Sequence, residues 1–331
     1  MIETKHIKLG LIGLGYIGIV HLRHSLNLTS KNLVAVADVS RKALEKAKKM
    51  GVKQTFSNYE QLLKKSNIDA VIIALPTHLH KSCALHFAEA GKDIFLEKPL
   101  ARNPTEGREI VRSAQKHGVK LMVGYPFRFN SSFRSLKEQL RNGELGEVQT
   151  AVAAFVGTGP FMHRAEGYAP RPVPSWWFDR RLTGGGALID LGSHMINLLR
   201  WYLGEIVDIK SYLGHRFNLD LEDYAACLAK FASGQIAYIN VGWFSSSYKV
   251  KAELFGTAKH GSAESNPPNR ILQAIQLMLG RPSQYHLPHF WELQHFIHCV
   301  RNDTAPKTSG TDALIDLEVI SKAYDNQVQL D

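Results

Sequence analysis

Residues 7–22 read IKLGLIGLGYIGIVHL, an apolar run that meets three glycines and continues as a helical pattern. Gly13 suits a tight turn, Gly15 lets the backbone approach a pyrophosphate, and Gly18 lets a helix pack closely on a strand. The N-terminus of that helix adds backbone donors and a partial positive charge. Asp38 ends the next apolar run 20 residues after Gly18, where a carboxylate binds ribose hydroxyls. The stretch therefore predicts a dinucleotide-binding turn.

The chain from residue 7 to residue 125 alternates short apolar runs with helical segments. The run at residues 70–75 is apolar at every position, so both faces of its strand must be covered. This alternation predicts a doubly wound parallel sheet. We expect its strands at residues 7–12, 33–37, 70–75, 94–96 and 120–124, and its helices at residues 16–27, 41–50, 82–90 and 105–117.

The pattern changes after Tyr125. Longer segments in which apolar and polar residues alternate are typical of half-buried strands, and they lie at residues 149–156, 225–231 and 235–243. A chain of 331 residues is also long for one hydrophobic core. We therefore expect an α/β Rossmann domain at residues 1–125 and an α+β domain with a mostly antiparallel open sheet at residues 126–331.

Composition excludes several classes of protein. Hydrophobic residues make up 44% of the chain and charged residues 21%, as in soluble globular proteins. The sequence has no apolar run of membrane-spanning length and no signal-peptide core at its N-terminus, so we expect a cytoplasmic protein without membrane partners. The widely spaced Cys83, Cys227 and Cys299 suggest neither a disulfide framework nor a zinc site, and we expect each to be buried.

The net charge of +10 is confined to the first domain. Residues 1–125 hold 20 Lys and Arg against 10 Asp and Glu, whereas residues 126–331 hold 20 against 20. The lysines lie mostly on helical stretches that read as solvated faces, without the interleaved aromatic residues of single-strand binders. We therefore expect no nucleic-acid partner.

A second glycine-rich motif, TGGGALIDLGSH, occupies residues 183–194. Asp190 and His194 are one helical turn apart, so both can face the same point. A solvated helix face would show the same spacing. The three glycines cost helix stability, however, which favours a site where another group approaches the backbone closely.

Residues 95–99, FLEKP, place two charges at the end of an apolar strand. Strands commonly end in charged residues and proline, because proline cannot join a ladder. A strand that ends at the carboxyl edge of a doubly wound sheet, however, delivers its last residues into the ligand crevice. Lys98 is therefore a candidate for contact with a bound molecule.

These motifs together resemble the Gfo/Idh/MocA family of NAD(P)-dependent dehydrogenases, which includes glucose-fructose oxidoreductase and inositol dehydrogenase. The resemblance rests on GLGYIG, ALPTHLH, AGKDIFLEKP, GGGALIDLGSH and EDYAACLAKFASGQ, and it extends to ELQHFIHCVRNDTAPKTSGTDAL near the end. The chain departs from the family pattern at Asn197, at Tyr224 and in the long stretch 266–288. The family also implies a cis Lys98–Pro99 bond and a homodimer or homotetramer formed through the C-terminal sheet.

The resemblance implies three catalytic residues. His194 would take the proton of a secondary hydroxyl while hydride leaves for nicotinamide, Lys98 would stabilise the alkoxide, and Asp190 would orient His194 or bind a neighbouring hydroxyl. Which of Lys98 and His194 is the base stays open. The implied cofactor contacts are Gly13, Gly15, Tyr16, Ile17, Gly18, Asp38, Arg41, Leu75, Pro76, His80, Glu97 and Lys98, and the implied substrate contacts are Lys98, Arg128, Trp177, Asp190 and His194.

Asp38 favours NAD over NADP because a carboxylate repels a 2′-phosphate, although Arg41 could bind that phosphate and leaves NADP possible. The expected substrate is a sugar, a sugar derivative or a cyclitol. A basic stretch hints at an anionic sugar or sugar nucleotide, but the zero net charge of the second domain leaves a neutral sugar or inositol open. The stretch, residues 163–181, contains His163, Arg164, Arg171, Arg180 and Arg181.

Two other functions remain open at this point. A glycosidase or epimerase could use tightly held NAD for transient oxidation, and a sensor could bind a dinucleotide without catalysis. No metal is expected, because no carboxylate-histidine helix motif accompanies the scattered histidines near the end of the chain. We interpret these as core or interface residues: His286, His289, His295 and His298.

Overall fold

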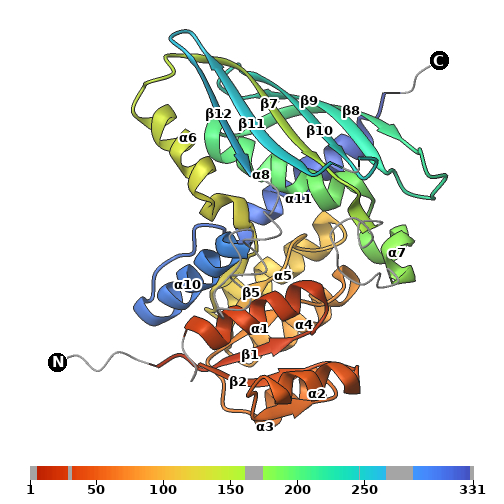
Figure 1. Cartoon of the computed structure of the whole chain (residues 1–331), viewed down its shortest axis with the longest axis vertical. Coiled ribbons are helices and arrows are strands. Elements are labelled where there is room, and N and C mark those ends of the chain that lie inside the picture. The colour runs from red at the N-terminus through yellow and green to blue at the C-terminus, as the bar shows by residue number, and fades with distance from the viewer. Residues whose placement is uncertain (1–5, 29–31, 161–173, 246, 266–285, 329–331) are drawn as a thin grey trace. The chain divides into compact units, whose positions relative to one another are not determined.

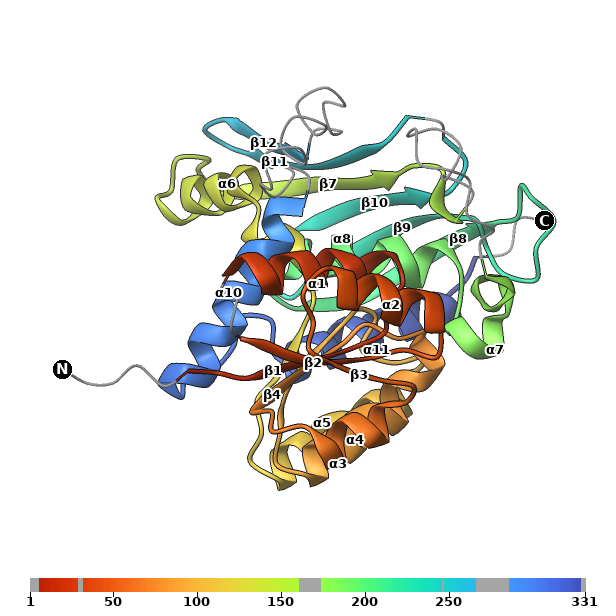
Figure 2. The ribbon, with the colours of Figure 1, turned by 60° about the horizontal axis from the view of Figure 1, so that its bottom comes forward.

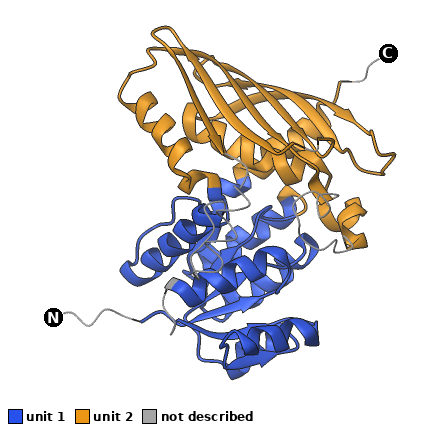
Figure 3. Cartoon of the chain, viewed as in Figure 1, with its two compact units in different colours: residues 1–101, 105–126, 269–314 blue, residues 102–104, 127–268, 315–331 orange. Residues whose placement is uncertain are grey.

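The computed structural model describes residues 6–28, 32–160, 174–245, 247–265 and 286–328 (Figure 1). The chain forms two compact units (Figure 3), each built from separated segments. The first unit contains residues 1–101, 105–126 and 269–314, and the second contains residues 102–104, 127–268 and 315–331. The assignment of cofactor binding to residues 1–125 and of substrate binding to residues 126–331 stays a prediction.

The first unit contains a six-stranded parallel sheet in the order β3-β2-β1-β4-β5-β6. The expected doubly wound parallel sheet is thus confirmed. The strand order reverses between β1 and β4, and such a switch point opens a crevice at the carboxyl ends of the strands. The strands are β1 (Leu9–Ile12), β2 (Leu33–Ala37), β3 (Gln54–Phe56), β4 (Ala70–Ile73), β5 (Asp93–Leu96) and β6 (Leu121–Val123).

Helices cover both faces of this sheet, as the fully buried β4 requires (Figure 2). Side-chain caps begin two of them: Ser40 accepts a hydrogen bond from Ala43 N, and Asn58 accepts one from Gln61 N. A late helix packs against the first one and against β5. The helices are α1 (Tyr16–Leu28), α2 (Arg41–Lys49), α3 (Tyr59–Lys65), α4 (His80–Glu89), α5 (Pro104–Lys116) and α10 (Leu287–Asn302).

The second unit contains a six-stranded sheet in the order β12-β11-β7-β10-β9-β8. Its neighbours run antiparallel except for β10 and β7, which are parallel, so the expected mostly antiparallel sheet is confirmed. The strands are β7 (Val148–Val156), β8 (Ile206–Gly214), β9 (Tyr224–Phe231), β10 (Ile236–Gly242), β11 (Lys249–Gly256) and β12 (His260–Ser265).

One face of the second sheet packs on helices, whereas the other carries exposed side chains. In β9, the buried Ala225, Cys227 and Ala229 alternate with Tyr224 and Leu228, which are 40% and 54% exposed. The helical segments of this unit include α6 (Ser131–Arg141), α7 (Arg180–Thr183), the π-helix η5 (Leu188–Gly192), α8 (Ser193–Leu203) and most of α11 (Gly310–Asp325). Both η5 and α8 contact β7 and β10.

No described helix combines the length and the apolar character that crossing a bilayer requires.

Candidate functional site

The three glycines between β1 and α1 have different structural roles. Gly13 has φ +88°, and a Cβ there would lie 2.2 Å from the Ala74 carbonyl oxygen. At Gly18 a Cβ would lie 2.0 Å from the Gly13 carbonyl oxygen. At Gly15 a Cβ would meet no atom within 4 Å. The fold itself therefore requires the first and third glycines, whereas the second leaves a backbone surface that a pyrophosphate can approach, as NAD binding needs.

Asp38 follows β2 and its carboxylate holds the turns around it. Its Oδ2 accepts a hydrogen bond from Leu14 N at 2.6 Å, and its Oδ1 accepts one from Ser40 N at 2.7 Å. The Asp38 carboxylate therefore fixes the glycine loop, a role that sequence reasoning missed. Arg41 is exposed, and its Nε lies 3.1 Å from Glu45 Oε1 on the same helix. Tyr16 is half-exposed, with its hydroxyl 3.3 Å from His286 Nε2.

The loops after β1, β4 and β5 lie at one edge of the sheet, because these strands are parallel neighbours. Gly13, Pro76 and Lys98 therefore share the carboxyl edge at the switch point. The Lys98–Pro99 bond is cis, which confirms the expectation. His80 is buried, and its Nε2 and Nδ1 lie 2.9 Å from Leu75 O and 3.0 Å from Pro99 O.

Burial lowers the pKa of His80, which favours a neutral ring with one N–H. Such a ring donates to only one of its two carbonyl neighbours at a time. His80 thus connects the loops after β4 and β5. Its direct contact with a cofactor stays a prediction, as do the contacts proposed for Ile17 and Leu75.

Glu97 is buried, in contrast to the half-buried Lys98 that follows it. Its Oε1 lies 2.6 Å from His21 Nε2 on α1, and its Oε2 accepts a hydrogen bond from Lys98 N at 3.2 Å. His21, Glu97 and Glu292 of α10 form a cluster. Each contributes one potential metal-ligand atom, a ring nitrogen or a carboxylate oxygen, and these atoms lie within 4.8 Å of one another. The sequence did not suggest this cluster, because its members are far apart along the chain.

In the second unit, Asp190 and His194 lie at a change from π-helix to α-helix. Asp190 belongs to η5 and His194 to the first turn of α8; such π-helical turns are frequent at functional sites. Trp243 Nε1 donates a hydrogen bond to Asp190 Oδ2 at 3.2 Å. His194 is 7% exposed, and its ring centroid lies 5.0 Å from that of Phe127. The alternative of a solvated helix face is therefore excluded for His194.

The three glycines before η5 are explained by close contacts within the second unit. A Cβ at Gly186 would lie 1.8 Å from the Glu222 carbonyl oxygen, and one at Gly185 would lie 2.0 Å from the Tyr324 hydroxyl. The Glu222 carboxylate accepts hydrogen bonds from Gly186 N, Leu188 N and Tyr324 Oη at 2.9, 3.0 and 2.7 Å. Burial raises the pKa of Glu222. Some of the groups that approach this backbone thus belong to the protein itself, namely to Glu222 and Tyr324. Sequence reasoning did not identify these two residues.

The other predicted substrate residues lie on several elements of the second unit. The Arg128 guanidinium lies 4.8 Å from the Trp201 ring centroid and 3.5 Å from Asn197 Oδ1. Asn197 is buried and donates to Asp316 Oδ2 at 2.7 Å. Trp177 stacks on Trp176, with ring centroids 5.2 Å apart.

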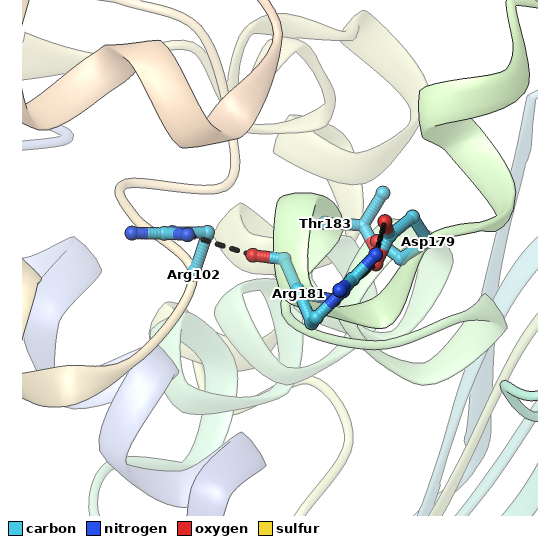
Figure 4. A network of polar contacts seen from close by, with 4 residues as sticks. All are labelled: Arg102, Asp179, Arg181 and Thr183. Carbon is cyan, nitrogen blue, oxygen red and sulfur yellow. Dashed lines mark hydrogen bonds and ion pairs between the residues drawn. The ribbon is translucent and has the colours of Figure 1, made fainter.

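Two arginines of the basic stretch have partners within the second unit. Arg181 pairs with Asp179, with Nη2 and Oδ2 2.7 Å apart, and its carbonyl oxygen accepts a hydrogen bond from Arg102 (Figure 4). The Arg180 guanidinium lies 5.2 Å from the Tyr324 ring centroid. His163, Arg164 and Arg171 lie outside the described residues.

The late histidines of the first unit differ in exposure. His286 is buried, His289 and His295 are half-buried, and His298 is exposed. Burial lowers the pKa of His286 and of His295 to about 4. The buried environment expected for the three cysteines is confirmed at Cys83, Cys227 and Cys299.

Known proteins match both parts of the chain. Residues 7–125 match the model of the oxidoreductase family with an NAD-binding Rossmann fold, and residues 133–261 match the model of the GFO/IDH/MocA C-terminal domain. Myo-inositol 2-dehydrogenase of Thermotoga maritima is 26% identical over 324 residues, covering 92% of either chain. D-glucoside 3-dehydrogenase of Escherichia coli is 30% identical over 259 residues, covering 77% of this chain and 67% of the relative.

Solved structures agree with these matches. The crystal structure of a putative myo-inositol dehydrogenase from Sinorhizobium meliloti is 25% identical, with a TM-score of 0.81 and 97% of both chains covered. The chain that resembles these dehydrogenases has three features of a candidate site. They are the open backbone at Gly15, Lys98 at the same sheet edge and the π-helix that carries Asp190. The chain belongs to the Gfo/Idh/MocA family of NAD-binding oxidoreductases.

Proposed function

We propose that the protein is an NAD-dependent dehydrogenase that oxidises a secondary hydroxyl of a neutral sugar, sugar derivative or cyclitol. The supporting observation is that the open backbone at Gly15 and the side chain of Lys98 belong to one edge of one sheet. A dinucleotide held at Gly15 would extend along that edge, where a switch point provides its crevice. The related proteins named above act on myo-inositol and on D-glucosides.

In the proposed mechanism, three side chains act on the substrate hydroxyl. His194 removes its proton, Lys98 stabilises the developing negative charge on oxygen, and Asp190 orients the substrate or His194. Bound nicotinamide supplies the hydride acceptor. The hydrogen bond from Trp243 holds the Asp190 carboxylate in one orientation. Phe127 and Phe155 restrict the His194 ring, whose centroid lies 5.0 and 5.7 Å from theirs.

A neutral substrate is favoured by the contacts of Arg180 and Arg181, the two arginines of the basic stretch that the structure describes. The Arg181 charge is paired with Asp179. Arg180 lies over the Tyr324 ring. An anionic sugar would have to compete with these partners for either guanidinium.

A panel of inositols, neutral sugars, uronic acids and sugar nucleotides, assayed for NADH formation, tests the function. Continued accumulation of NADH excludes the glycosidase or epimerase alternative, which returns its hydride in each cycle. Turnover itself excludes the sensor. On the active substrate, Lys98→Met and His194→Asn should each lower kcat by about 10²- to 10⁴-fold. Wild-type turnover in both variants would refute the mechanism, and selective oxidation of anionic sugars would refute the neutral substrate.

The exposed face of the second sheet supports assembly of two or four copies. It carries large exposed apolar side chains together with charged ones such as Lys230, and a patch of this kind marks an interaction surface. We propose that a second copy covers it. Tyr238→Glu should shift the mass measured by light scattering to that of the monomer, and a monomeric wild type would refute the proposal. The patch consists of Tyr212, Tyr224, Leu228, Ile236, Tyr238 and Phe255. A cytoplasmic location stays a prediction.

A further inference from the structure

Two buried histidines of the first unit hold the residues on either side of Lys98. On one side, His21 Nε2 lies 2.6 Å from Glu97 Oε1. On the other, His80 Nδ1 lies 3.0 Å from Pro99 O. His21 is 0% exposed and His80 1% exposed. The backbone that carries Lys98 is therefore attached to the interior of the unit at two points.

The Glu97 carboxylate has little freedom to move. Its second oxygen accepts the hydrogen bond from Lys98 N at 3.2 Å. Gly124, which follows β6, packs so closely that a Cβ there would lie 3.2 Å from Glu97 Oε1. His21 itself is enclosed, with its ring centroid 5.1 Å from that of Phe95 on β5. A change at His21 therefore reaches Lys98 through one carboxylate and one backbone hydrogen bond.

Within the cluster, Glu97 is the charged carboxylate and Glu292 the neutral one. Glu292 is 0% exposed, and in the described part of the chain neither of its oxygens has a hydrogen-bond partner. Burial, and then the nearby Glu97 charge, raise the pKa of Glu292 well above its usual value, which favours its protonated form. His21 Nδ1 is also buried and lacks a hydrogen-bond partner among the described residues, so the ring proton belongs on Nε2, facing Glu97.

The distance between His21 and Glu97 argues against a shared cation. A zinc ion bound at about 2.0–2.2 Å from both atoms would hold them about 3 Å apart or more. The observed 2.6 Å is that of a direct charge-assisted hydrogen bond.

We propose that His21, acting through Glu97, is a positioning residue that fixes the direction in which Lys98 extends from the sheet edge. The inference rests on the proposed role of Lys98 and deepens it. A displacement of about 1 Å in a catalytic group costs about 10²-fold in rate. His21 would therefore act on turnover through Glu97 and Lys98, without itself touching cofactor or substrate.

Kinetics of matched variants test this inference. His21→Leu removes the donor, His21→Gln restores an N–H donor, and Glu292→Gln replaces one neutral side chain of the cluster by another of the same shape. We expect kcat to fall about 10- to 100-fold in His21→Leu, less in His21→Gln, and to stay within about twofold in Glu292→Gln. The KM for NAD should stay constant in all three variants.

A double-mutant cycle separates positioning from a general structural effect. In a Lys98→Met background, His21→Leu should lower kcat by less than about twofold, because the group that it positions is gone. Full additivity of the two losses would overturn the inference. Wild-type turnover of Lys98→Met alone would instead overturn the proposed function, so the two failures are distinguishable.

A spectroscopic readout tests the same inference without a substrate. Reductive ¹³C-methylation of the lysines gives one NMR signal for Lys98, identified by its loss in Lys98→Met. That signal should shift or broaden in His21→Leu and stay unchanged in Glu292→Gln. An unchanged Lys98 signal in a folded His21→Leu variant would overturn the inference. So would a stoichiometric metal ion in the purified protein that Glu292→Gln removes.

Discussion

His24 is expected to lower the stability of the protein as the pH falls, because its ring is buried. The side chain lies on α1 and is 2% exposed. Burial, and then the neighbouring His21 and His286, lower the pKa of His24 to about 3. The unfolded chain has the ordinary value of about 6.5. Between these values the unfolded state binds more protons, so stability falls as pH falls from about 6.5 toward 3.

The size of the effect follows from the same two values. At pH 5 an unfolded-state pKa of about 6.5 gives a loss of RT ln(1 + 10^1.5), which is about 2 kcal/mol. His24→Phe keeps an aromatic ring of similar size and removes the titration. Urea denaturation at pH 7 and pH 5 should therefore show a loss of unfolding free energy about 2 kcal/mol smaller in His24→Phe than in the wild type. The exposed His6→Phe is the matched control. Equal losses in His24→Phe and wild type would refute the reasoning.

Three further changes test other parts of the structure. Gly15→Ala should weaken NADH binding at least about tenfold without lowering the melting temperature, whereas Gly18→Ala should destabilise the fold by about 1–3 kcal/mol. Calorimetry measures both effects. Unchanged NADH affinity in Gly15→Ala would contradict the proposed cofactor site. Asp38→Ala should lower the preference for NADH over NADPH at least about tenfold in measured Kd ratios, because the repelling carboxylate is gone; an unchanged ratio would contradict this. Tyr324→Phe should lower the unfolding free energy by about 1–3 kcal/mol, because Glu222 loses a donor; unchanged urea denaturation would show that the bond is not stabilising.

Local patterns predicted most of the first sheet. Residues 33–37 were expected as a strand and form β2 at the same bounds, because LVAVA is apolar, β-branched at two positions and flanked by polar residues. The third strand was missed, because Gln54–Phe56 is short and has no buried residue. The helix of the second motif was expected to be regular, whereas Leu188–Gly192 is a π-helix. Hydrophobic periodicity does not distinguish these windings.

The contacts that brace the candidate site were less predictable. Glu222 bonds to Gly186, Leu188 and Tyr324, the last of which is 102 residues away. The pair of His21 and Glu97 spans 76 residues. Such contacts depend on how strands and helices are brought together, and a single sequence contains no local signal for them. The glycine turn was predictable because its chemistry is contained within six residues, Gly13 to Gly18.

Because α10 belongs to the first unit but lies late in the sequence, the first unit cannot be completed until late in synthesis. This helix packs on α1 and β5 within the first unit, and Phe296 lies 5.7 Å from Phe95 between ring centroids. About 260 residues separate the end of α1 from the start of α10. At about 5–20 residues per second, a ribosome needs on the order of ten seconds to a minute to make them. Throughout that interval the surface that α10 covers, including Phe95 of β5, lacks its partner, and chaperones that recognise exposed aromatic side chains have time to bind it.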